Sequence, residues 1–390
     1  MIKLPVDRGM FLAACLLGCL SGGAVASEGM PEFSWNTIPR YMHVRKMTAF
    51  TPEEVNYLAK FPLITLEKTT GMRDSGSVEA GSLKAAEAVK AVNPDAKILY
   101  YRNIIVHYGG YAADKKLKEI KSPFLADRSG NTKLIRNKVP AYDLSNNALQ
   151  KWWLENAREV CASKAIDGLF IDGNIKALEK GYLRSQIGAE KRDEVTEGYH
   201  FMMKQLPSVM EENDLLVANV IRARFNDSGL EYLDYFDGSY IEGFEHAVGQ
   251  MSREDYVAKG IEAVQKAARS GKIIAFTFGT GAYADTDMDE GGPKSKGKRA
   301  SLQDRLTYTM AIFLVCAEKH SYFMLSDGYG VDKTEGRLWM NDAPEYSRPL
   351  GPPKGPAKRN AYVYERSFEH ADVRVDIEKE TAEITWKPAS

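Results

Sequence analysis

The sequence predicts a (β/α)8 barrel of the α/β class with a small antiparallel β appendage at its C-terminal end. Strand-like and helix-like segments alternate eight times over roughly 300 residues, which is the pattern of a closed parallel sheet surrounded by helices. The fourth strand-like segment, residues 168–171, is apolar on both faces and is therefore expected to be covered on both sides. No Gly-x-Gly-x-x-Gly turn follows the first strand, so a doubly wound open sheet is the weaker alternative.

The eight predicted strands are short runs rich in aliphatic and aromatic residues. In chain order they are residues 41–47, 63–67, 97–102, 168–171, 215–220, 238–241, 272–278 and 322–325. The helices predicted between them are residues 51–61, 83–92, 143–160, 190–212, 229–236 (a brief piece), 252–268 and 306–315. Thr51 and Ser252 are expected N-caps, while Asn93 with the following proline and Gly271 end their helices.

The last part of the chain departs from this alternation. Residues 349–356 contain four prolines and two glycines, a composition typical of a linker or an extended loop. Three β segments follow, and they are too few to fold alone. These segments are residues 361–366, 373–377 and 382–386. We therefore expect a signal peptide at 1–26, a catalytic barrel at 27–345 and an appendage at 346–390 that packs on the barrel.

The charge balance excludes some classes of partner. The 52 Lys and Arg residues nearly match the 53 Asp and Glu residues, and the formal net charge is -1. A nearly neutral chain gives no electrostatic reason to expect binding to nucleic acid or to an anionic membrane surface. The 20 Tyr residues offer flat surfaces with hydrogen-bonding groups, and sugars are one class of ligand that suits such surfaces.

The N-terminus resembles an export signal. A basic region with Lys3 and Arg8 precedes the apolar residues 10–20, and an A-x-A cleavage site occupies residues 24–26. The apolar run is too short to span a bilayer. We expect a secreted or periplasmic protein. The alternative is a membrane-anchored lipoprotein, because a Leu-Leu-Gly-Cys sequence resembles a lipobox that would make Cys19 a lipidated N-terminus.

Two cysteines, Cys161 and Cys316, remain after such processing, and both lie in apolar helical patterns. We expect two buried free thiols, with a single disulfide between them as the alternative. No Cys/His cluster has the spacing of a zinc site, so we expect no metal and no cofactor. The acidic run at residues 285–290 matches a calcium loop only loosely, and a solvated loop is favoured.

Polar side chains follow the predicted strands, at the end where (β/α)8 enzymes place their chemistry. Because side chains alternate in direction along a strand, Phe170 and Asp172 share one face opposite Ile171, as Tyr240 and Glu242 share another. We expect these faces to point into the barrel mouth. The rim residues expected from the strand ends are Arg45 or His43, Glu67, Arg102 or Asn103, Asp172, Asn219, Glu242 and Asp327.

Two carboxylates across one barrel mouth are the minimum set for glycoside hydrolysis. One of them protonates the leaving oxygen, and the other attacks the sugar or activates water. Asp172 and Glu242 come from strands that are two apart in the barrel, near enough to flank one glycosidic bond. The apolar neighbours Phe170 and Phe244 would raise the pKa of one carboxyl and keep it protonated as the acid.

Structural roles are the alternative for the same residues. Asp172 would then only cap the following helix, and Glu242 would form a buried ion pair with Arg222 or Arg45. Asp327, in an Asp-Gly pair, is more typical of a loop cap than of a substrate contact. Other residues expected to pair, to support the site or to fill the core are Glu67 with Lys68, Glu245 and His246, and Trp152 and Trp153. The aromatic residues near loops that could stack on sugar rings are Trp35, Tyr101, Tyr108, Tyr111 and Tyr329.

Four short motifs and the C-terminal segment give the chain a family resemblance. The motifs are Asp-Gly-Leu-Phe-Ile-Asp-Gly (167–173), Tyr-Tyr-Arg-Asn (100–103), Ala-Asn (218–219) and Tyr-Ile-Glu-Gly-Phe (240–244). They are similar to the corresponding strands of glycoside hydrolases in the α-galactosidase superfamily. Residues 349–369, with the valine-rich residues 373–375 after them, resemble the sheet-forming end of the hypothetical glycosyl hydrolase family fifteen type.

The resemblance covers most of residues 35–386 and implies a TIM barrel that acts on polysaccharide. It implies Asp172 as the nucleophile and Glu242 as the acid and base, whereas the better-known relatives often have Asp at the second position. We therefore expect a secreted, cofactor-independent glycoside hydrolase. The residues expected to bind its substrate are Arg45, Glu67, Tyr101, Arg102, Asn103, Asn219 and Asp327. The alternatives are a polysaccharide lyase on the same scaffold and a barrel that binds glycan without cleaving it.

Overall fold

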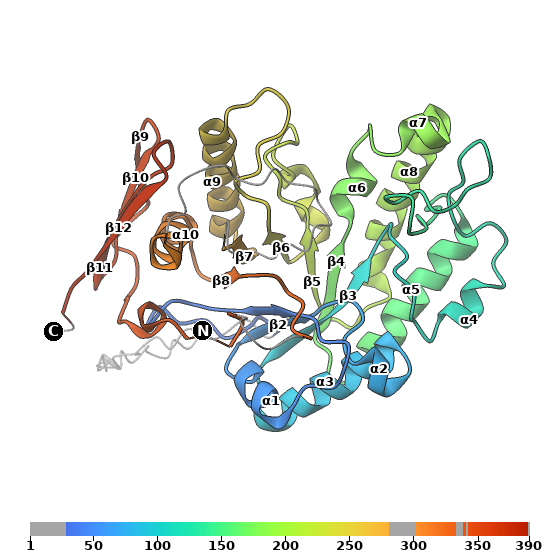
Figure 1. The fold of residues 1–390 in the computed structure, drawn as a ribbon, viewed down its shortest axis with the longest axis horizontal. Coiled ribbons are helices and arrows are strands. Elements are labelled where there is room, and N and C mark those ends of the chain that lie inside the picture. Colours follow the sequence, from blue (N-terminus) through green and yellow to red (C-terminus); the bar gives the residue numbers. More distant parts are fainter. Residues whose placement is uncertain (1–28, 281–300, 333–337, 341, 389–390) are drawn as a thin grey trace, which may run out of the picture.

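The computed structural model describes residues 29–280, 301–332, 338–340 and 342–388, and its centre is a parallel sheet of eight strands (Figure 1). The strands lie in chain order, each hydrogen-bonded to the next. Their bounds are β1 Met42–Val44, β2 Leu63–Leu66, β3 Lys97–Asn103, β4 Gly168–Asp172, β5 Leu215–Asn219, β6 Gly238–Ile241, β7 Ile273–Gly279 and β8 Ser321–Ser326. All eight predicted strands are confirmed, with bounds that differ by only a few residues.

The sheet closes on itself through the segments on either side of β1. Arg40 forms a parallel bridge with Phe323 of β8, and Arg45 forms a second one with Gly330. The backbone N–H of Arg45 also donates to Tyr329 O at 2.7 Å. An open sheet would leave two edges with unpaired backbone groups, so these bridges make the sheet a barrel and rule out the doubly wound alternative.

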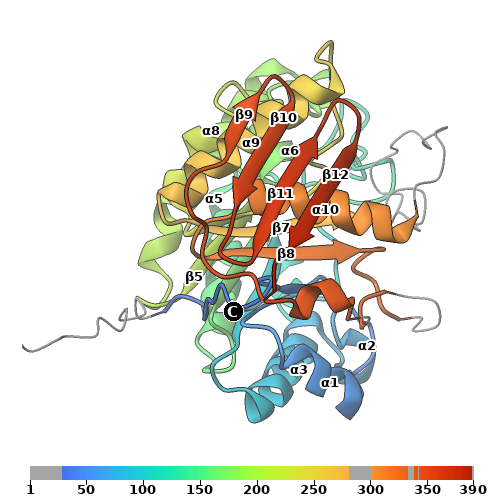
Figure 2. The same ribbon diagram turned by 90° about the vertical axis from the view of Figure 1, so that its left-hand side faces the viewer.

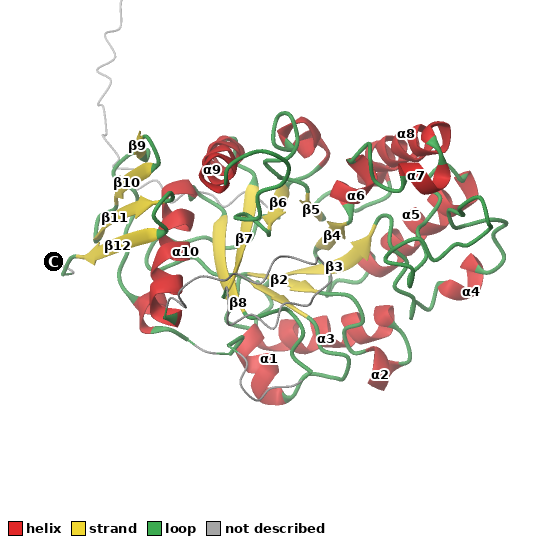
Figure 3. Cartoon of the chain, turned by 45° about the horizontal axis from the view of Figure 1, so that its top comes forward, coloured by secondary structure: helices red, strands yellow, loops and turns green. Residues whose placement is uncertain are grey.

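Helices follow the strands and surround them (Figure 3). Capping explains where several begin: Thr51 and Glu54 form a reciprocal capping box at α1, and Ser252 and Ser301 accept backbone hydrogen bonds at α9 and α10. The helical elements are α1 Pro52–Leu58, α2 Met72–Ser75, α3 Val78–Val92, α4 Asp114–Leu117, α5 Asn147–Cys161, α6 Asn174–Leu178, α7 Arg184–Ile187, α8 Ala189–Gln205, η1 Leu206–Ser208, η2 Leu230–Tyr235, α9 Arg253–Arg269, α10 Leu302–Cys316 and η5 Pro344–Ser347.

Several predicted helix bounds differ from the observed ones by a few residues, and the two largest differences have local reasons. The helix predicted from residue 83 begins at Val78, because Ser77 accepts a backbone hydrogen bond and caps it. The helix predicted to end at residue 212 ends at Gln205, since Pro207 lacks the N–H needed to continue the helical hydrogen bonds and the chain turns into η1. The short helices α2, α4, α6 and α7 are too brief to show a helical period in the sequence.

The C-terminal segment forms an antiparallel sheet of four strands in the order β12-β11-β10-β9, where the sequence predicts three. The bounds are β9 Lys358–Asn360, β10 Val363–Ser367, β11 Ala371–Asp376 and β12 Thr381–Trp386. The additional strand is β9, whose residues are all polar and exposed and therefore show no alternation of apolar and polar side chains.

This sheet covers α10 on the side away from the barrel (Figure 2). Every residue from Tyr308 to Cys316 is buried, so this part of α10 has no solvent-exposed face and needs cover on both sides. Tyr364, Val373 and Val375 of the small sheet are buried as well. Burial of these apolar surfaces against α10 is what attaches the appendage to the barrel.

The expectations for the cysteines and for two tryptophans are confirmed, and those for the N-terminus and the acidic run concern residues that the structure does not describe. Within the described residues, Cys161 and Cys316 are buried free thiols, as expected. Trp152 and Trp153 are core residues, also as expected. None of the described helices is both long and apolar enough to cross a bilayer. The export signal with Cys19 and the acidic run at 285–290 lie outside the described residues.

Candidate active site

Aromatic rings fill the barrel beneath its C-terminal end. Phe170 of β4 stacks on Tyr101 of β3 with ring centroids 5.8 Å apart, and it meets Tyr240 of β6 edge-to-face at 5.2 Å. His43 of β1 contacts the rings of Phe170 and Tyr240 at 4.9 and 4.8 Å. Since these side chains come from four strands, Phe170 and Tyr240 point into the barrel, and the rings form an apolar floor under the polar strand ends.

Asp172, the last residue of β4, receives two hydrogen bonds from β3. Tyr101 Oη donates to Asp172 Oδ2 at 2.7 Å, and Asn103 Nδ2 donates to the same oxygen at 3.0 Å. The amide of Asn103 is held in this orientation because its Oδ1 accepts from the backbone N–H groups of Ile105 and Val106. These bonds fix the position of the Asp172 carboxylate.

Gly173 makes the close approach of Asn103 to Asp172 feasible. Its φ is +81°, and a Cβ atom built there would lie 2.4 Å from Asn103 Oδ1. A larger residue would strain the backbone and displace the amide that binds the carboxylate. The glycine after the strand-end aspartate is therefore a requirement of the site.

Asn219, the last residue of β5, joins two carboxylates. Its Nδ2 donates to Asp172 Oδ1 at 3.2 Å and to Glu242 Oε1 at 2.6 Å. Because both bonds start from one nitrogen atom, the two carboxylate oxygens lie within about 6 Å of each other. The side chains of Asp172 and Glu242 thus face each other across one gap.

Glu242 follows β6 and is partly accessible, with 34% of its side chain exposed. Arg222 Nη2 lies 3.0 Å from Glu242 Oε1, so the Glu–Arg pair named as a structural alternative is present. Arg222 is buried and also donates to Ile221 O at 3.2 Å. Arg222 and Asn219 both donate to Oε1 of Glu242, and neither of these two bonds involves Oε2.

A buried ion cluster lies beside this pair, at the end of β2. Lys68 Nζ is 3.1 Å from Glu67 Oε2 and donates to Tyr329 Oη at 2.9 Å. The ammonium group also lies over the rings of Tyr108 and Tyr329, at 4.9 and 4.4 Å from their centroids. His43 Nε2 is 3.5 Å from Glu67 Oε1. The expected Glu67–Lys68 pair is confirmed, and it brings a positive charge into the barrel mouth.

Positive charges in the mouth favour the ionised form of Asp172. Burial raises the pKa of the carboxyl, but the charges of Lys176 and Lys68 and the hydrogen bond from Tyr101 together lower this pKa below its usual value. The pKa of Glu67 is also lowered, since Lys68 and His43 outweigh the effect of burial. Asp172 is therefore a carboxylate at neutral pH.

Three residues expected at the mouth or on sugar rings lie elsewhere. Arg102 is fully buried on the outer face of β3, and its guanidinium lies 4.4 Å from the ring of Tyr111 and 5.2 Å from that of Trp152. It points away from the side that Asn103 occupies, so the expectation that Arg102 contacts substrate is wrong. Tyr111 belongs to the same outer cluster. Trp35 packs near the other end of the strands.

Arg45 and Asp327 lie at the rim and have structural contacts there. The Arg45 guanidinium is 5.4 Å from the ring of Tyr329. Asp327 Oδ2 accepts from the backbone N–H of Leu338 at 3.2 Å, which is a loop-capping contact. Lys176 is a charged residue of the site that the sequence does not predict. It stands four residues after Asp172, and the turn into α6 brings its charge back towards that carboxylate.

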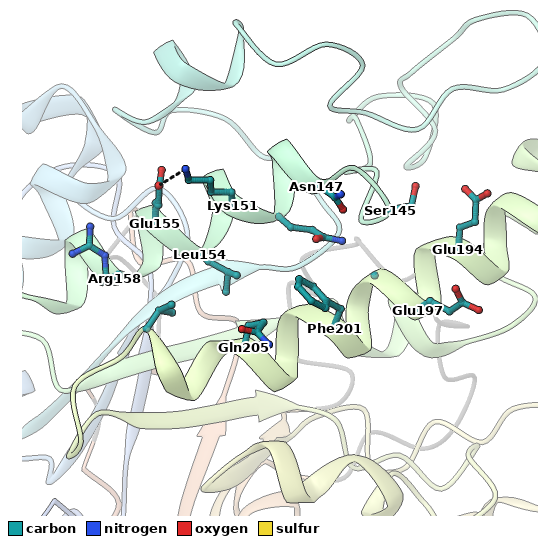
Figure 4. Close-up of a pocket in the computed structure, with 13 residues that line it drawn as sticks. Ser145, Asn147, Lys151, Leu154, Glu155, Arg158, Glu194, Glu197, Phe201 and Gln205 are labelled. Atoms are coloured by element: carbon teal, nitrogen blue, oxygen red, sulfur yellow. Dashed lines mark ion pairs between the residues drawn. The ribbon is translucent and has the colours of Figure 1, made fainter.

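The mouth is distinct from a groove on the outside of the barrel. The groove has a volume of about 940 Å³ and lies between α5 and α8 (Figure 4). Leu154 and Phe201 line it together with polar residues of the same two helices and of the segments next to them. The part of the chain that the structure describes contains no group of three or more His, Cys, Asp or Glu side chains suited to a metal ion.

Comparison with known proteins points to one family. A family model described as hypothetical glycosyl hydrolase family 15 matches residues 90–372. None of the curated proteins matches the chain.

Several solved glycosidases are similar in structure to this chain. The GH36 α-galactosidase AgaA from Geobacillus stearothermophilus is 12% identical, and the match covers 89% of this chain and 48% of that one, with a TM-score of 0.49. An α-amylase from Anoxybacillus is 10% identical over 88% of this chain and 87% of that one, with a TM-score of 0.49. The maltogenic α-amylase AmyB from Thermotoga neapolitana is 12% identical over 88% and 86%, with a TM-score of 0.47. The chain spans about half the length of the α-galactosidase.

Proposed function

The chain belongs to the hypothetical glycosyl hydrolase family 15, and we propose that this glycoside hydrolase cleaves an oligo- or polysaccharide with retention of configuration. Asp172 is the nucleophile, and Glu242 is the general acid and base. In the first step Glu242 protonates the leaving oxygen while Asp172 forms a bond to the anomeric carbon. In the second step Glu242 takes a proton from water, which attacks the same carbon and releases Asp172.

The observation that carries this proposal is the amide of Asn219 between the two carboxylates. Carboxyl groups about 5–5.5 Å apart are typical of retaining enzymes, and about 6.5–9.5 Å of inverting enzymes, which need room for a water molecule. The hydrogen bonds of 3.2 and 2.6 Å from one amide nitrogen keep the bound oxygens within about 6 Å of each other. This spacing supports direct attack by a carboxylate.

The charges around the pair support the assignment of roles. Two acids this close resist being ionised together, so the one with the lower pKa carries the negative charge. Although burial raises the pKa of Asp172, the charges of Lys176 and Lys68 together with the hydrogen bonds from Tyr101 and from the backbone of Gly173 lower it below its usual value. The proposal therefore assigns the negative charge to Asp172 and the role of proton donor to Glu242. Because Arg222 and Asn219 both approach Oε1 of Glu242, a proton on Oε2 is compatible with both contacts.

The other residues of the mouth are assigned either to orienting the carboxylates or to binding the substrate. Tyr101, Asn103 and Asn219 orient the carboxylates. Arg45, Glu67 and Asp327, which follow the ends of β1, β2 and β8, are assigned to substrate binding. The basic and apolar N-terminal segment supports a site of action outside the cytoplasm.

A panel of oligo- and polysaccharides, scored for new reducing ends, tests the proposal. For Asp172→Asn and Glu242→Gln we expect a loss of activity on the order of 10³-fold or more with little change in melting temperature. Glu197→Gln, on the outer groove, is the matched control and should retain full activity. Proton NMR should show that the product formed first has the same anomeric configuration as the substrate.

Other outcomes identify the alternatives. Equal activity of the wild type and both carboxylate variants contradicts the assigned roles, and a product of opposite configuration contradicts retention. Products that absorb in the ultraviolet indicate a polysaccharide lyase. Binding of a glycan without formation of new reducing ends indicates a barrel that binds the glycan but does not cleave it.

A further inference from the structure

A network of carboxylates and arginines begins in the loop that carries Glu242. Glu245, in the same loop, pairs with Arg253 at the start of α9 at 3.8 Å and with Arg305 of α10. Arg305 Nε also donates to Gly279 O, at the end of β7, at 2.9 Å. Only 16% of the Glu245 side chain is exposed, so these ion pairs are weakly screened by water.

Arg253 continues the network into the turn between β11 and β12. Its Nε lies 3.1 Å from Glu380 Oε1, and its Nη2 donates to Ile377 O. Its Nη1 donates to Tyr308 Oη of α10 at 3.4 Å. One guanidinium therefore connects the loop at residues 242–252 with α10 and with the C-terminal sheet.

Phe244 gives the same loop an apolar anchor. Its ring lies 4.7 Å from that of Phe276 of β7. It also fits against α9 where Gly260 has no side chain, since a Cβ atom at Gly260 would lie 2.7 Å from the ring. Phe244 and Glu245 thus anchor the loop within three residues of Glu242.

We propose that Glu245 and Arg253 are positioning residues through which the C-terminal sheet holds Glu242 at its working distance from Asp172. The inference rests on the proposed role of Glu242 as the acid. A general acid must lie within hydrogen-bonding reach of the leaving oxygen, and a displacement of about 1 Å costs on the order of 10²-fold in rate. The C-terminal sheet then contributes to catalysis as well as covering α10.

Leaving-group dependence separates this role from a general loss of structure. The probes are phenyl and 2,4-dinitrophenyl glycosides of the sugar released from the panel, because dinitrophenolate departs without protonation and phenolate does not. For Glu245→Gln and Arg253→Met we expect kcat/KM to fall about tenfold with the phenyl glycoside and to stay within about twofold with the dinitrophenyl glycoside.

Glu262→Gln is the matched control. Glu262 of α9 pairs with Arg359 of β9, so this ion pair also joins α9 to the C-terminal sheet but does not reach the loop at 242–252. It should leave kcat/KM unchanged with both glycosides. If Arg253→Met does not fold, Glu380→Gln removes only the partner in the β11–β12 turn and gives the same test.

Hydrogen exchange of the amides at 243–252 gives a readout that does not depend on activity. We expect faster exchange in Glu245→Gln and Arg253→Met and wild-type exchange in Glu262→Gln. Wild-type kinetics in the first two variants, or an equal loss with both glycosides, overturns the inference. Full activity of Glu242→Gln with the phenyl glycoside, together with faster exchange in Glu245→Gln, refutes the role of Glu242 and leaves the coupling of the sheet to the loop supported.

Discussion

The two faces of β3 hold two buried clusters made of the same kinds of residues. On the inner face, Tyr101 and Asn103 donate hydrogen bonds to Asp172 at 2.7 and 3.0 Å. On the outer face, Tyr100 and Arg102 are buried just as completely, but they lie in the layer between the strand and its helices. Neighbouring residues of the strand therefore lie on opposite faces, one in the site and the next in the layer between the strand and its helices.

The difference between the clusters is where their polar groups converge. The Arg102 guanidinium lies 4.4, 5.2 and 5.3 Å from the rings of Tyr111, Trp152 and Trp153, an arrangement in which aromatic faces replace water around the charge. The inner groups converge on a carboxylate that is reached from the mouth. A buried charge alone thus does not identify a functional site. Hydrogen-bonding side chains that meet at a carboxylate open to the barrel mouth are the better indication.

Arg102→Ala should separate structure from function most strongly. The substitution leaves a cavity between Trp152 and Trp153, so we expect the free energy of unfolding to fall by about 2–4 kcal/mol. Because Arg102 does not contact the mouth, kcat/KM of the folded protein should stay within about threefold. Urea unfolding and initial rates measure the two quantities. A loss of activity without a loss of stability would place Arg102 in the site after all.

His107 should make the outer cluster sensitive to acid. Its Nδ1 lies 2.7 Å from Tyr142 Oη, and burial together with the charge of Arg102 lowers the pKa of His107 to about 4. In the unfolded chain its pKa is about 6.5, so between these values the unfolded state binds a proton that the folded state does not. The free energy of unfolding therefore falls as the pH falls through this window, by about 3 kcal/mol in total.

The test of this pH dependence compares His107→Phe with the wild type by urea unfolding from pH 7 to pH 4. The phenyl ring retains the contacts with Phe124 and Tyr142 but cannot titrate. We expect the variant to lose less stability than the wild type over this range. His246→Phe, at an exposed histidine, should follow the wild type. Parallel curves for His107→Phe and the wild type would show that His107 titrates alike in both states.

The sequence predicts the strands well and the faces of β3 poorly, and both results have physical causes. Apolar runs between glycines, prolines and capping residues locate all eight strands. On β3, however, each face carries one tyrosine and one polar residue, so alternation alone cannot tell the inner face from the outer one. The pairing of Tyr101 with Phe170 and of Asn103 with Asp172 decides it, and this register depends on the neighbouring strand.

The charges around Asp172 were harder to predict for a related reason. Lys176 and Arg222 lie after the ends of β4 and β5, where the path of the chain is not periodic. Their proximity to the carboxylates depends on how each chain segment turns after its strand. The strand-end residues Asp172, Asn219 and Glu242 could be assigned from sequence because parallel strands end at the same rim of a barrel.

Lys176→Met should change the inner cluster with the smallest effect on the fold. Lys176 is partly exposed and lowers the pKa of Asp172, so its removal raises that pKa. The proposed nucleophile must be ionised to react, so the acid limb of the kcat/KM profile should move to higher pH, while kcat/KM at neutral pH stays within about threefold. Lys180→Met, at an exposed lysine in the same segment, should leave the limb in place. An acid limb that does not move, or that moves to lower pH, would mean that a group other than Asp172 must ionise for the reaction. The inner face of β3 would then differ from the outer face in position but not in its role in the reaction.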